Sequence, residues 1–216
     1  MKNTTELIGF YGSDESHALS AWTSTTRDIE SKRERIPALL KMLAENGHHT
    51  PFEKSTLHFL VRCDLASQIH LLKHRVAVSI NGESARYKEL KEDKYYLPDD
   101  WEGVDYMEES WAKILKQFSD DSNAMYHKCL EEITPILGRK RAKESARYFK
   151  LYNTQTTLDI SFNFRSFMHF QGLRNKPDAQ KEIREIAQSM LTLVQNIEGN
   201  PFEHSLKAFG YDSQIN

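Results

Sequence analysis

Residues 55–63 read Ser-Thr-Leu-His-Phe-Leu-Val-Arg-Cys, in which apolar and polar side chains alternate. Strict alternation puts the apolar side chains on one face of an extended chain, so this stretch predicts a half-buried strand. Cys63 follows the apolar side of the alternation, which favours a small buried core residue over a nucleophile. The other elements are placed outward from this strand.

Toward the N-terminus, residues 7–11 are apolar and aromatic and predict a first strand that ends at Gly12. Residues 36–46 repeat apolar side chains at helical spacing and predict a helix, for which Gly47 supplies the stop. The C-terminal boundary of this helix is therefore clearly marked in the sequence.

Two capping signals flank the central strand. Thr50-Pro51-Phe52-Glu53 has the form of a capping box with proline at the first helical position, which predicts a helix start. Asp64 is placed to cap a helix over residues 65–74. Residues 76–87 are rich in turn-forming and hydroxyl side chains and predict a loop.

The C-terminal half is expected to be mainly helical. Apolar side chains at helical spacing from Met107 to Ile133 predict one long helix or two consecutive ones. Further elements are expected as a helix over residues 140–149, a strand over 156–162, a helix from Asn163 to about residue 173, and an amphipathic helix over 178–197. This irregular order favours an α/β fold of the α+β type, with a mixed sheet and long helices in a single domain over residues 1–216.

Bulk composition limits the class of protein. The 216 residues are 39% hydrophobic and 28% charged, with a mean hydropathy of -0.64, which predicts a soluble globular protein. The net charge of -2 gives no global basic field, so nucleic-acid binding is not expected. Neither a leader nor a membrane span is apparent, and the two cysteines lack metal-ligand spacing, so we expect a cytoplasmic protein without a metal site.

The densest polar chemistry lies in Lys73-His74-Arg75 and, after eight residues, in Ser84-Ala85-Arg86-Tyr87. Guanidinium groups bind phosphate bidentately and loop amides fill its remaining acceptors, so one interpretation is a site for a phosphorylated ligand. The other interpretation is a helix C-terminus whose cations complement the helix dipole. The cluster by itself leaves both open.

Four blocks in order resemble the flavin-dependent thymidylate synthases (ThyX family). They are residues 48–53 (His-His-Thr-Pro-Phe-Glu), residues 73–87, Asn163-Phe164-Arg165-Ser166 and Leu173-Arg174. The family's hallmark is Arg-His-Arg, seven residues, then Ser with Arg-Tyr just beyond, preceded by Gly-His-x-x-Pro-Phe-Glu. The blocks spread over roughly residues 36 to 190, which makes the match more specific than one short motif.

This chain departs from the hallmark at several positions. Lys73 replaces the first arginine, and the gap before Ser84 is eight residues instead of seven, which places an insertion within residues 76–82. Lysine keeps the charge but lacks the planar fork of arginine. A family asparagine corresponds to His169, and a family glutamine to His70.

The resemblance implies the family's α/β fold, assembled as a homotetramer with active sites shared between subunits. It implies conversion of dUMP to dTMP, with bound FAD, NADPH as reductant and methylenetetrahydrofolate as one-carbon donor. The implied FAD-binding residues are Thr50, Glu53, Lys73, His74, Arg75, Asn163, Arg165 and His169. The implied dUMP-binding residues are His70, Lys73, Glu83, Ser84, Ala85, Arg86, Arg147 and Arg174, with Arg174 favouring the ionised uracil ring.

Most of these residues also have a purely structural interpretation. Thr50 with Glu53, and separately Asn163, are placed to cap helices. Arg147 lies in a charged, solvated stretch, and Arg174 after Gly172 suits a helix C-terminus. The apolar side chains of residues 164–170 are expected to pack in the core rather than to sandwich a flavin.

Two alternative functions are retained. The insertion and Lys73 are compatible with a flavin-dependent enzyme that makes a hydroxymethylated pyrimidine nucleotide instead of a methylated one. A non-catalytic nucleotide- or nucleic-acid-binding module would use Lys73, Arg75, Arg86 and the basic stretch at 139–150, and the net charge of -2 argues against it.

Overall fold

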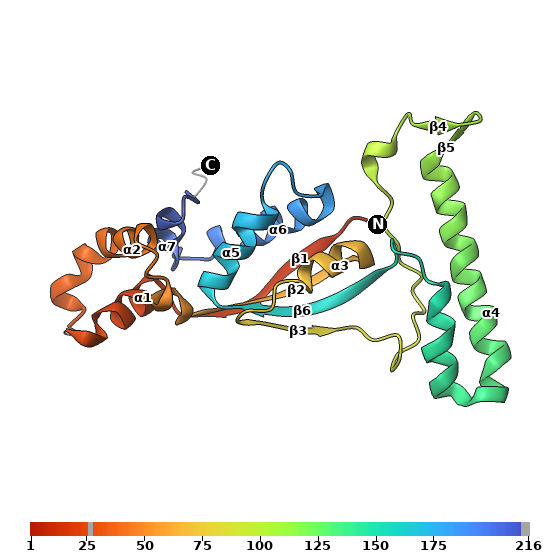
Figure 1. Ribbon diagram of the computed structural model, residues 1–216, viewed down its shortest axis with the longest axis horizontal. Helices are drawn as coiled ribbons and strands as arrows, with labels where there is room; N and C mark the ends of the chain where they lie inside the picture. Colours follow the sequence, from red (N-terminus) through yellow and green to blue (C-terminus); the bar gives the residue numbers. More distant parts are fainter. Residues whose placement is uncertain (26–27, 213–216) are drawn as a thin grey trace. The chain divides into compact units, whose positions relative to one another are not determined.

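The computed structural model describes residues 1–25 and 28–212, and the chain divides into two compact units. Unit 1 comprises Met1–Thr4, Val61–Leu71 and Asn81–Leu158, and unit 2 comprises Thr5–Leu60, Leu72–Ile80 and Asp159–Asn216. Strands and helices occur in the irregular order that was predicted, which confirms the α/β class (Figure 1). A single-domain organisation stays a prediction.

A four-stranded sheet has the strand order β1-β2-β6-β3. Its strands are β1 (Thr4–Tyr11), β2 (Thr56–Asp64), β3 (Val78–Gly82) and β6 (Gln155–Phe162). The helices are α1 (Asp14–Ala21), α2 (Ile36–Glu45), α3 (Leu65–Leu71), α4 (Trp111–Ala146), α5 (Phe164–Arg174), α6 (Lys181–Gln195) and α7 (Glu203–Ala208). A short hairpin, β4 (Asp105–Tyr106) and β5 (Glu109–Ser110), precedes α4. Short 3-10 turns are η1 (Trp22–Ser24), η2 (Glu30–Arg35), η3 (Thr50–Glu53), η4 (Asp99–Trp101) and η5 (Arg147–Phe149).

The core of unit 2 is built from one face of its strands and from helix α5. Phe59 of β2 and Phe167 of α5 are fully buried, and their rings stack at 5.6 Å between centroids. Helix α6 lies beside α5 (Figure 1), and the Gln171 side chain donates a 2.8 Å hydrogen bond to the carbonyl of Ala187. The aromatic side chains of α5 therefore pack in the core, as predicted.

Two predicted helix caps are confirmed. The Asp64 carboxylate accepts from the backbone N–H of Ser67 at 2.8 Å, and the Asn163 side-chain oxygen accepts from the N–H of Ser166 at 2.8 Å. Both caps satisfy amides that the first turn of a helix leaves without an intrahelical partner. The helix predicted over residues 178–197 begins three residues later than expected, at Lys181 after Gln180.

The predicted capping box at residues 50–53 is wrong. These residues form the 3-10 turn η3, which His49 precedes, and the Thr50 side chain makes no capping hydrogen bond. The chain enters β2 at Thr56, which leaves too few residues for α-helical hydrogen bonds. Because Glu53 does not take part in a capping box, its carboxylate is available to pair with a residue of another element.

The predicted loop at residues 76–87 is wrong in part, because Val78–Gly82 is the edge strand β3. Its polar residues Ser79 and Asn81 are exposed, while Val78 and Ile80 are half-buried. The hydroxyl and amide side chains that favour a turn therefore occupy the exposed positions of a strand. Polar side chains are typical of edge strands, where one row of backbone groups faces outward.

Helix α4 of unit 1 runs without a break through residues 111–133, so one long helix is the correct alternative for that stretch. It is interrupted at Gly138, whose backbone takes the left-handed values φ 75 and ψ 150. Tyr126 and Leu130 before the break pack against Ala142 and Ala146 after it. The two parts of α4 lie side by side (Figure 1). Their buried side chains form a small core of their own.

A buried lysine lies beside this core. The Lys150 side chain is 3% exposed, and its ammonium donates to Asp93 at 2.9 Å and to the Asn123 side-chain oxygen at 2.7 Å. The ammonium also lies 4.2 Å from the centroid of the Tyr126 ring. Burial lowers the pKa of Lys150, and the Asp93 carboxylate opposes this shift.

Within the described part of the chain, none of the helices combines the length and the apolar character required to cross a membrane.

Candidate functional site

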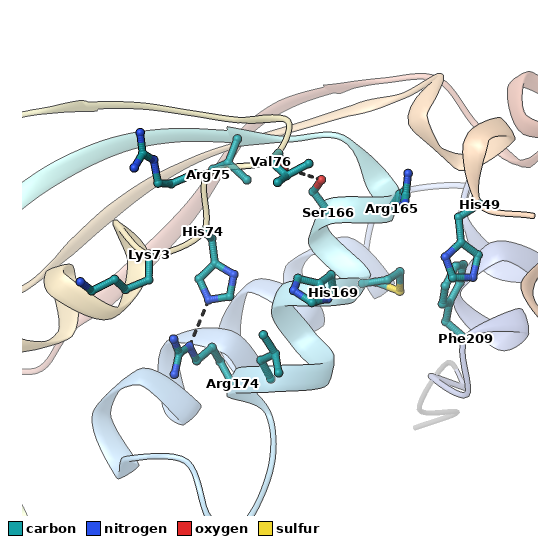
Figure 2. Close-up of a pocket in the computed structure, with 13 residues that line it drawn as sticks. His49, Lys73, His74, Arg75, Val76, Arg165, Ser166, His169, Arg174 and Phe209 are labelled. Atoms are coloured by element: carbon teal, nitrogen blue, oxygen red, sulfur yellow. Dashed lines mark hydrogen bonds between the residues drawn. The ribbon is translucent and has the colours of Figure 1, made fainter. Parts of the chain in front are cut away.

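A cavity of about 640 Å³ lies within unit 2. Its lining combines the segment before β3 with the first residue of β3, several residues of α5, and one residue each from the segments before η3 and after α7 (Figure 2). The lining residues are His49, Lys73, His74, Arg75, Val76, Val78, Arg165, Ser166, Met168, His169, Leu173, Arg174 and Phe209. A volume of this size is in the range of small-molecule and cofactor sites.

The first turn of α5 holds the segment before β3 against the cavity. The Ser166 hydroxyl donates to the carbonyl of Val76 at 2.7 Å, and the N–H of Asn163 donates to the carbonyl of Ala77 at 3.3 Å. Ala77 has a positive φ of 51°, which a non-glycine residue adopts only when its surroundings enforce it. These contacts hold the backbone immediately after residues 73–75.

His74 and Arg174 are joined across the cavity. The Nε–H of Arg174 donates to Nε2 of His74 at 3.0 Å, and the His74 ring packs edge-on against Phe170 at 5.0 Å. Because an arginine Nε–H only donates, His74 Nε2 carries the lone pair and the neutral ring carries its proton on Nδ1. Among the described residues, no hydrogen bond engages the two terminal nitrogens of Arg174.

Positive charge dominates the polar lining. Lys73, Arg75, Arg165 and Arg174 are cationic, and the described lining includes no carboxylate. Arg165 forms an ion pair with Glu53 of η3, whereas Lys73 and Arg75 form no ion pair with any described residue. Cations without a carboxylate partner, such as Lys73 and Arg75, attract an anionic ligand such as a phosphate or pyrophosphate.

An aromatic and apolar surface completes the cavity. The rings of His49 and Phe209 lie 5.3 Å apart, and Met168, Leu173 and Val78 supply further apolar lining. A surface of this kind suits a planar ring system, because aromatic side chains stack on such rings. The cavity can therefore accept a ligand that combines phosphate groups with flat rings.

The structure brings six of the predicted ligand-binding residues together in this cavity: Lys73, His74, Arg75, Arg165, His169 and Arg174. Three others belong to unit 2 but are not in its lining. Thr50 borders a different, smaller pocket, Glu53 pairs with Arg165, and Asn163 caps α5.

The remaining predicted residues belong to unit 1. Ser84 accepts from the N–H of Arg86 at 3.3 Å, which shapes the turn that carries Ala85. The Arg86 guanidinium donates to Glu144 at 2.6 Å, and Glu83 accepts from Lys88 at 3.1 Å. His70 lies in α3 and Arg147 begins η5.

The lining residues for which no ligand-binding role was predicted include His49 and Phe209. His49 was given no function, and residues after 197 were assigned to no element. Helix α7 has only six residues, too few to show a helical repeat of apolar side chains. Both positions become recognisable only from the folded structure.

Other clusters of polar residues are distinct from this cavity. A pocket of about 230 Å³ in unit 1 is lined by both acids and bases, including Glu83, Asp93 and Lys150. In residues 1–25 and 28–212, His, Cys, Asp and Glu side chains do not gather in groups that could hold a metal ion. Burial raises the pKa of the Cys63 thiol, which keeps it from acting as a thiolate.

The comparisons with known proteins agree on one family. The family model described as "Thymidylate synthase complementing protein" matches residues 6–198. The flavin-dependent thymidylate synthase of Pseudothermotoga lettingae is 32% identical over 193 residues, which cover 89% of this chain and 85% of the relative. That of Thermosipho melanesiensis is 31% identical over 227 residues, with coverage of 99% and 94%.

A solved structure agrees with this assignment. The UMP/dUMP methylase PolB from Streptomyces cacaoi, bound with 5-Br dUMP, superposes with a TM-score of 0.77 at 26% sequence identity. The superposition covers 99% of this chain and 97% of that chain. The chain therefore belongs to the thymidylate synthase complementing proteins, the family of flavin-dependent thymidylate synthases, and is an enzyme of that family.

Proposed function

We propose that this chain converts dUMP to dTMP, with FAD bound in the cavity of unit 2, NADPH as reductant and methylenetetrahydrofolate as one-carbon donor. The observation that carries the proposal is the cavity itself, in which four cationic side chains and an aromatic surface surround about 640 Å³. The predicted cytoplasmic location belongs to the same proposal.

The residues of the cavity fit a flavin dinucleotide. Arg75 and Arg165 are suited to the pyrophosphate, since arginine binds phosphate oxygens with two parallel donors. His169, Met168 and the pair His49 and Phe209 offer surfaces for flat rings. Bound FAD would supply the two-electron redox chemistry that converts a methylene carbon into a methyl group.

The proposed overall reaction balances. One dUMP, one methylenetetrahydrofolate, one NADPH and one proton give one dTMP, one tetrahydrofolate and one NADP⁺. The uracil ring loses the hydrogen at position 5 and gains the carbon there, while the two carbon–nitrogen bonds of the folate methylene break. NADPH supplies the hydride that completes the methyl group.

Arg174 is proposed to stabilise negative charge on the uracil ring. A cation held beside the ring makes position 5 more nucleophilic, and arginine does this without changing its protonation state. The contact with His74 fixes the guanidinium through Nε and directs its other edge to a ligand. Preorganisation of this kind lowers the cost of reorientation during the reaction.

The remaining ligand roles are part of the proposal. Ser84, the amide of Ala85 and Arg86 would bind the dUMP phosphate and sugar, together with Glu83 and Arg147. His70 and Lys73 would approach the nucleotide from another subunit of a homotetramer. Support comes from the structural neighbour, whose two solved complexes hold 5-Br dUMP and 5-Br UMP.

The test is an absorption spectrum of the purified protein before and after addition of NADPH and dUMP. We expect an oxidised flavin spectrum that bleaches with NADPH, faster when dUMP is present, and a product with one added methyl group by mass spectrometry. Arg165→Ala should weaken FAD binding, whereas Arg35→Ala, an exposed arginine outside the cavity lining, should not. Colourless protein that takes up no FAD would overturn the proposal.

A second candidate is methylation of UMP as well as dUMP, because the structural neighbour is described as a UMP/dUMP methylase. The two candidates differ in whether a ribose 2′-hydroxyl is tolerated. Equal turnover of UMP and dUMP supports the second candidate, and turnover of dUMP alone supports the first. A hydroxymethyl increment on either product would instead support the hydroxymethylase alternative.

A further inference from the structure

Four buried side chains of unit 2 form a continuous hydrogen-bonded chain, here called the relay: Asp14, His17, Ser55 and Ser205. They are 7%, 0%, 3% and 0% exposed, respectively. Nδ1 of His17 lies 2.8 Å from the Ser205 hydroxyl, and Nε2 lies 2.8 Å from the Ser55 hydroxyl. The Ser205 hydroxyl in turn donates to Asp14 at 2.5 Å.

These contacts fix the direction of each hydrogen bond. The Ser205 hydroxyl donates its hydrogen bond to Asp14, so the Ser205 oxygen accepts a hydrogen bond from the Nδ1–H of His17. Nε2 of His17 then carries the lone pair and accepts from Ser55. The ring is neutral, in agreement with burial, which lowers the pKa of His17 to about 3.

The relay holds the start of helix α7. The two carboxylate oxygens of Asp14 accept from the backbone N–H groups of His204 and Ser205, each at 2.8 Å. The N–H of Asp14 donates to the carbonyl of Pro201 at 2.8 Å. A carboxylate in this position caps the helix start, and here the relay also orients it.

Helix α7 leads directly to the wall of the cavity. It ends at Ala208, and the next residue, Phe209, lines the cavity. The Phe209 ring packs edge-on against Phe52 at 4.9 Å and lies 5.3 Å from His49. The His17 ring packs against Phe52 from within the core, at 5.2 Å.

His49 and Phe209 lie together at one end of the cavity, and Lys73 and Arg174 lie at the other, with His169 between them (Figure 2). The proposed function puts the reacting pyrimidine and flavin rings beside Arg174. A dinucleotide extends away from its flavin ring toward a second flat ring, its adenine. His49 and Phe209 are placed to receive that second ring.

We propose that Phe209, with His49, is the stacking surface for the adenine of FAD, and that the relay is the positioning device that holds Phe209 there. The inference rests on the proposed function for the identity of the ligand. It assigns a role to Phe209 and to the relay, which lie outside the four blocks of the family resemblance.

The stacking role is tested by titrating flavin-stripped protein with FAD and with FMN, which lacks the adenine, and following flavin fluorescence. Stacking of a base on an aromatic side chain is strong enough that Phe209→Leu should raise the Kd for FAD about tenfold. The Kd for FMN should stay unchanged. Phe202→Leu is the matched control, because Phe202 belongs to the same aromatic cluster but not to the cavity lining.

The relay is tested with Ser205→Ala. Ser67→Ala is its matched control, because Ser67 is also fully buried and donates through its hydroxyl and its N–H to the capping Asp64, each at 2.8 Å. Hydrogen exchange of the flavin-free protein should become faster in residues 206–211 of Ser205→Ala only. The same variant should lose affinity for FAD and keep affinity for FMN, a split that a general loss of stability does not produce.

Each outcome decides a separate part of the proposal. Unchanged FAD affinity in Phe209→Leu, or equal losses for FAD and FMN, overturns the adenine surface. Unchanged exchange in residues 206–211 of Ser205→Ala overturns the relay. Wild-type protein that binds neither flavin overturns the proposed function instead, while the exchange experiment still tests the relay.

Discussion

Nε2 of His74 accepts a hydrogen bond from Nε–H of Arg174 at 3.0 Å, so a neutral imidazole orients a guanidinium at one end of the cavity. His74 is only 8% exposed, and its ring packs against Phe170. This packing restricts movement of the His74 ring when the Arg174 side chain moves. The guanidinium of Arg174 supplies the positive charge, and His74 sets the orientation of that guanidinium.

Arg174→Ala is expected to retain FAD and to lower kcat for dTMP formation by about 10²- to 10³-fold, the usual effect of removing one preorganised charge stabiliser. His74→Phe keeps the ring packing but removes the acceptor, so it should lower kcat by a smaller factor and leave KM for dUMP nearly unchanged. Product is measured by mass spectrometry and flavin content by absorbance. Arg184→Ala on α6 is the control, and near-normal dTMP formation by Arg174→Ala would contradict the assigned role.

Glu53→Gln should weaken FAD binding with little change in stability. The Glu53 and Arg165 side chains are 30% and 48% exposed, so their ion pair contributes less than about 1 kcal/mol to folding. Its expected role is to orient Arg165 toward the cofactor phosphates. Glu45→Gln removes a more exposed carboxylate that pairs with Lys41 on α2, and it should leave the Kd for FAD unchanged. Equal effects of the two variants would remove the orienting role.

His17→Gln should abolish part of the acid sensitivity of the protein. Burial lowers the pKa of His17 from its ordinary value of 6.5 to about 3 in the fold, so the unfolded chain takes up a proton that the folded chain refuses. Stability from this residue is therefore lost as pH falls from about 6.5 toward 3, by about 1.4 kcal/mol per pH unit. Above about pH 6.5 the ring is neutral in both the folded and the unfolded chain, and the effect vanishes.

Denaturant unfolding between pH 4 and 7 measures this slope. His58→Gln is the control, because His58 is partly exposed and pairs with Asp159 instead of lying in the core. Wild type and His58→Gln should share the steep dependence that His17→Gln lacks. Parallel curves for wild type and His17→Gln would show that His17 does not carry the effect.

Asp93→Asn should destabilise unit 1, because Lys150 would then be a buried charge without its carboxylate. Loss of one partner of a buried pair costs up to about 3–5 kcal/mol, and the partial exposure of Asp93 places the expected cost nearer 2 kcal/mol. Asparagine tolerates the positive φ of 46° at this position, so backbone strain is not added.

The double variant Asp93→Asn with Lys150→Met should recover part of the loss, since methionine packs on the Tyr126 ring without a charge. Urea unfolding compares these variants with Glu203→Gln, which breaks an exposed pair with Lys207 and should change stability by less than about 1 kcal/mol. A double variant less stable than Asp93→Asn would contradict the buried-charge explanation.

Local signals in the sequence predicted much of the fold. The alternation in β2 and the caps at Asp64 and Asn163 were correct because each depends on residues within a few positions of one another. The Thr50 prediction failed because a capping pattern does not reveal that a strand begins six residues later. The exposed polar residues of β3 resembled a turn because edge pairing is invisible to local patterns.

The cationic residues of the candidate site were predicted from the sequence, but the shape of the cavity was not. Family resemblance identified Arg165 and Arg174, and their positions on α5 follow from the predicted helix. The contact between Arg174 and His74 joins residues 100 positions apart, and the pairing of His49 with Phe209 spans a still longer separation. Contacts of this range depend on the tertiary structure, which local patterns do not encode.

The cationic lining of the cavity belongs to a protein whose net charge is -2. A concave site with low-dielectric walls focuses its field, so small anions are drawn in faster than uncharged ligands, while the negative remainder repels long polyanions. Exposed charges are screened over about 10 Å at 0.1 M ionic strength. Capture of phosphorylated ligands should therefore slow as salt rises, even where their final affinity changes little.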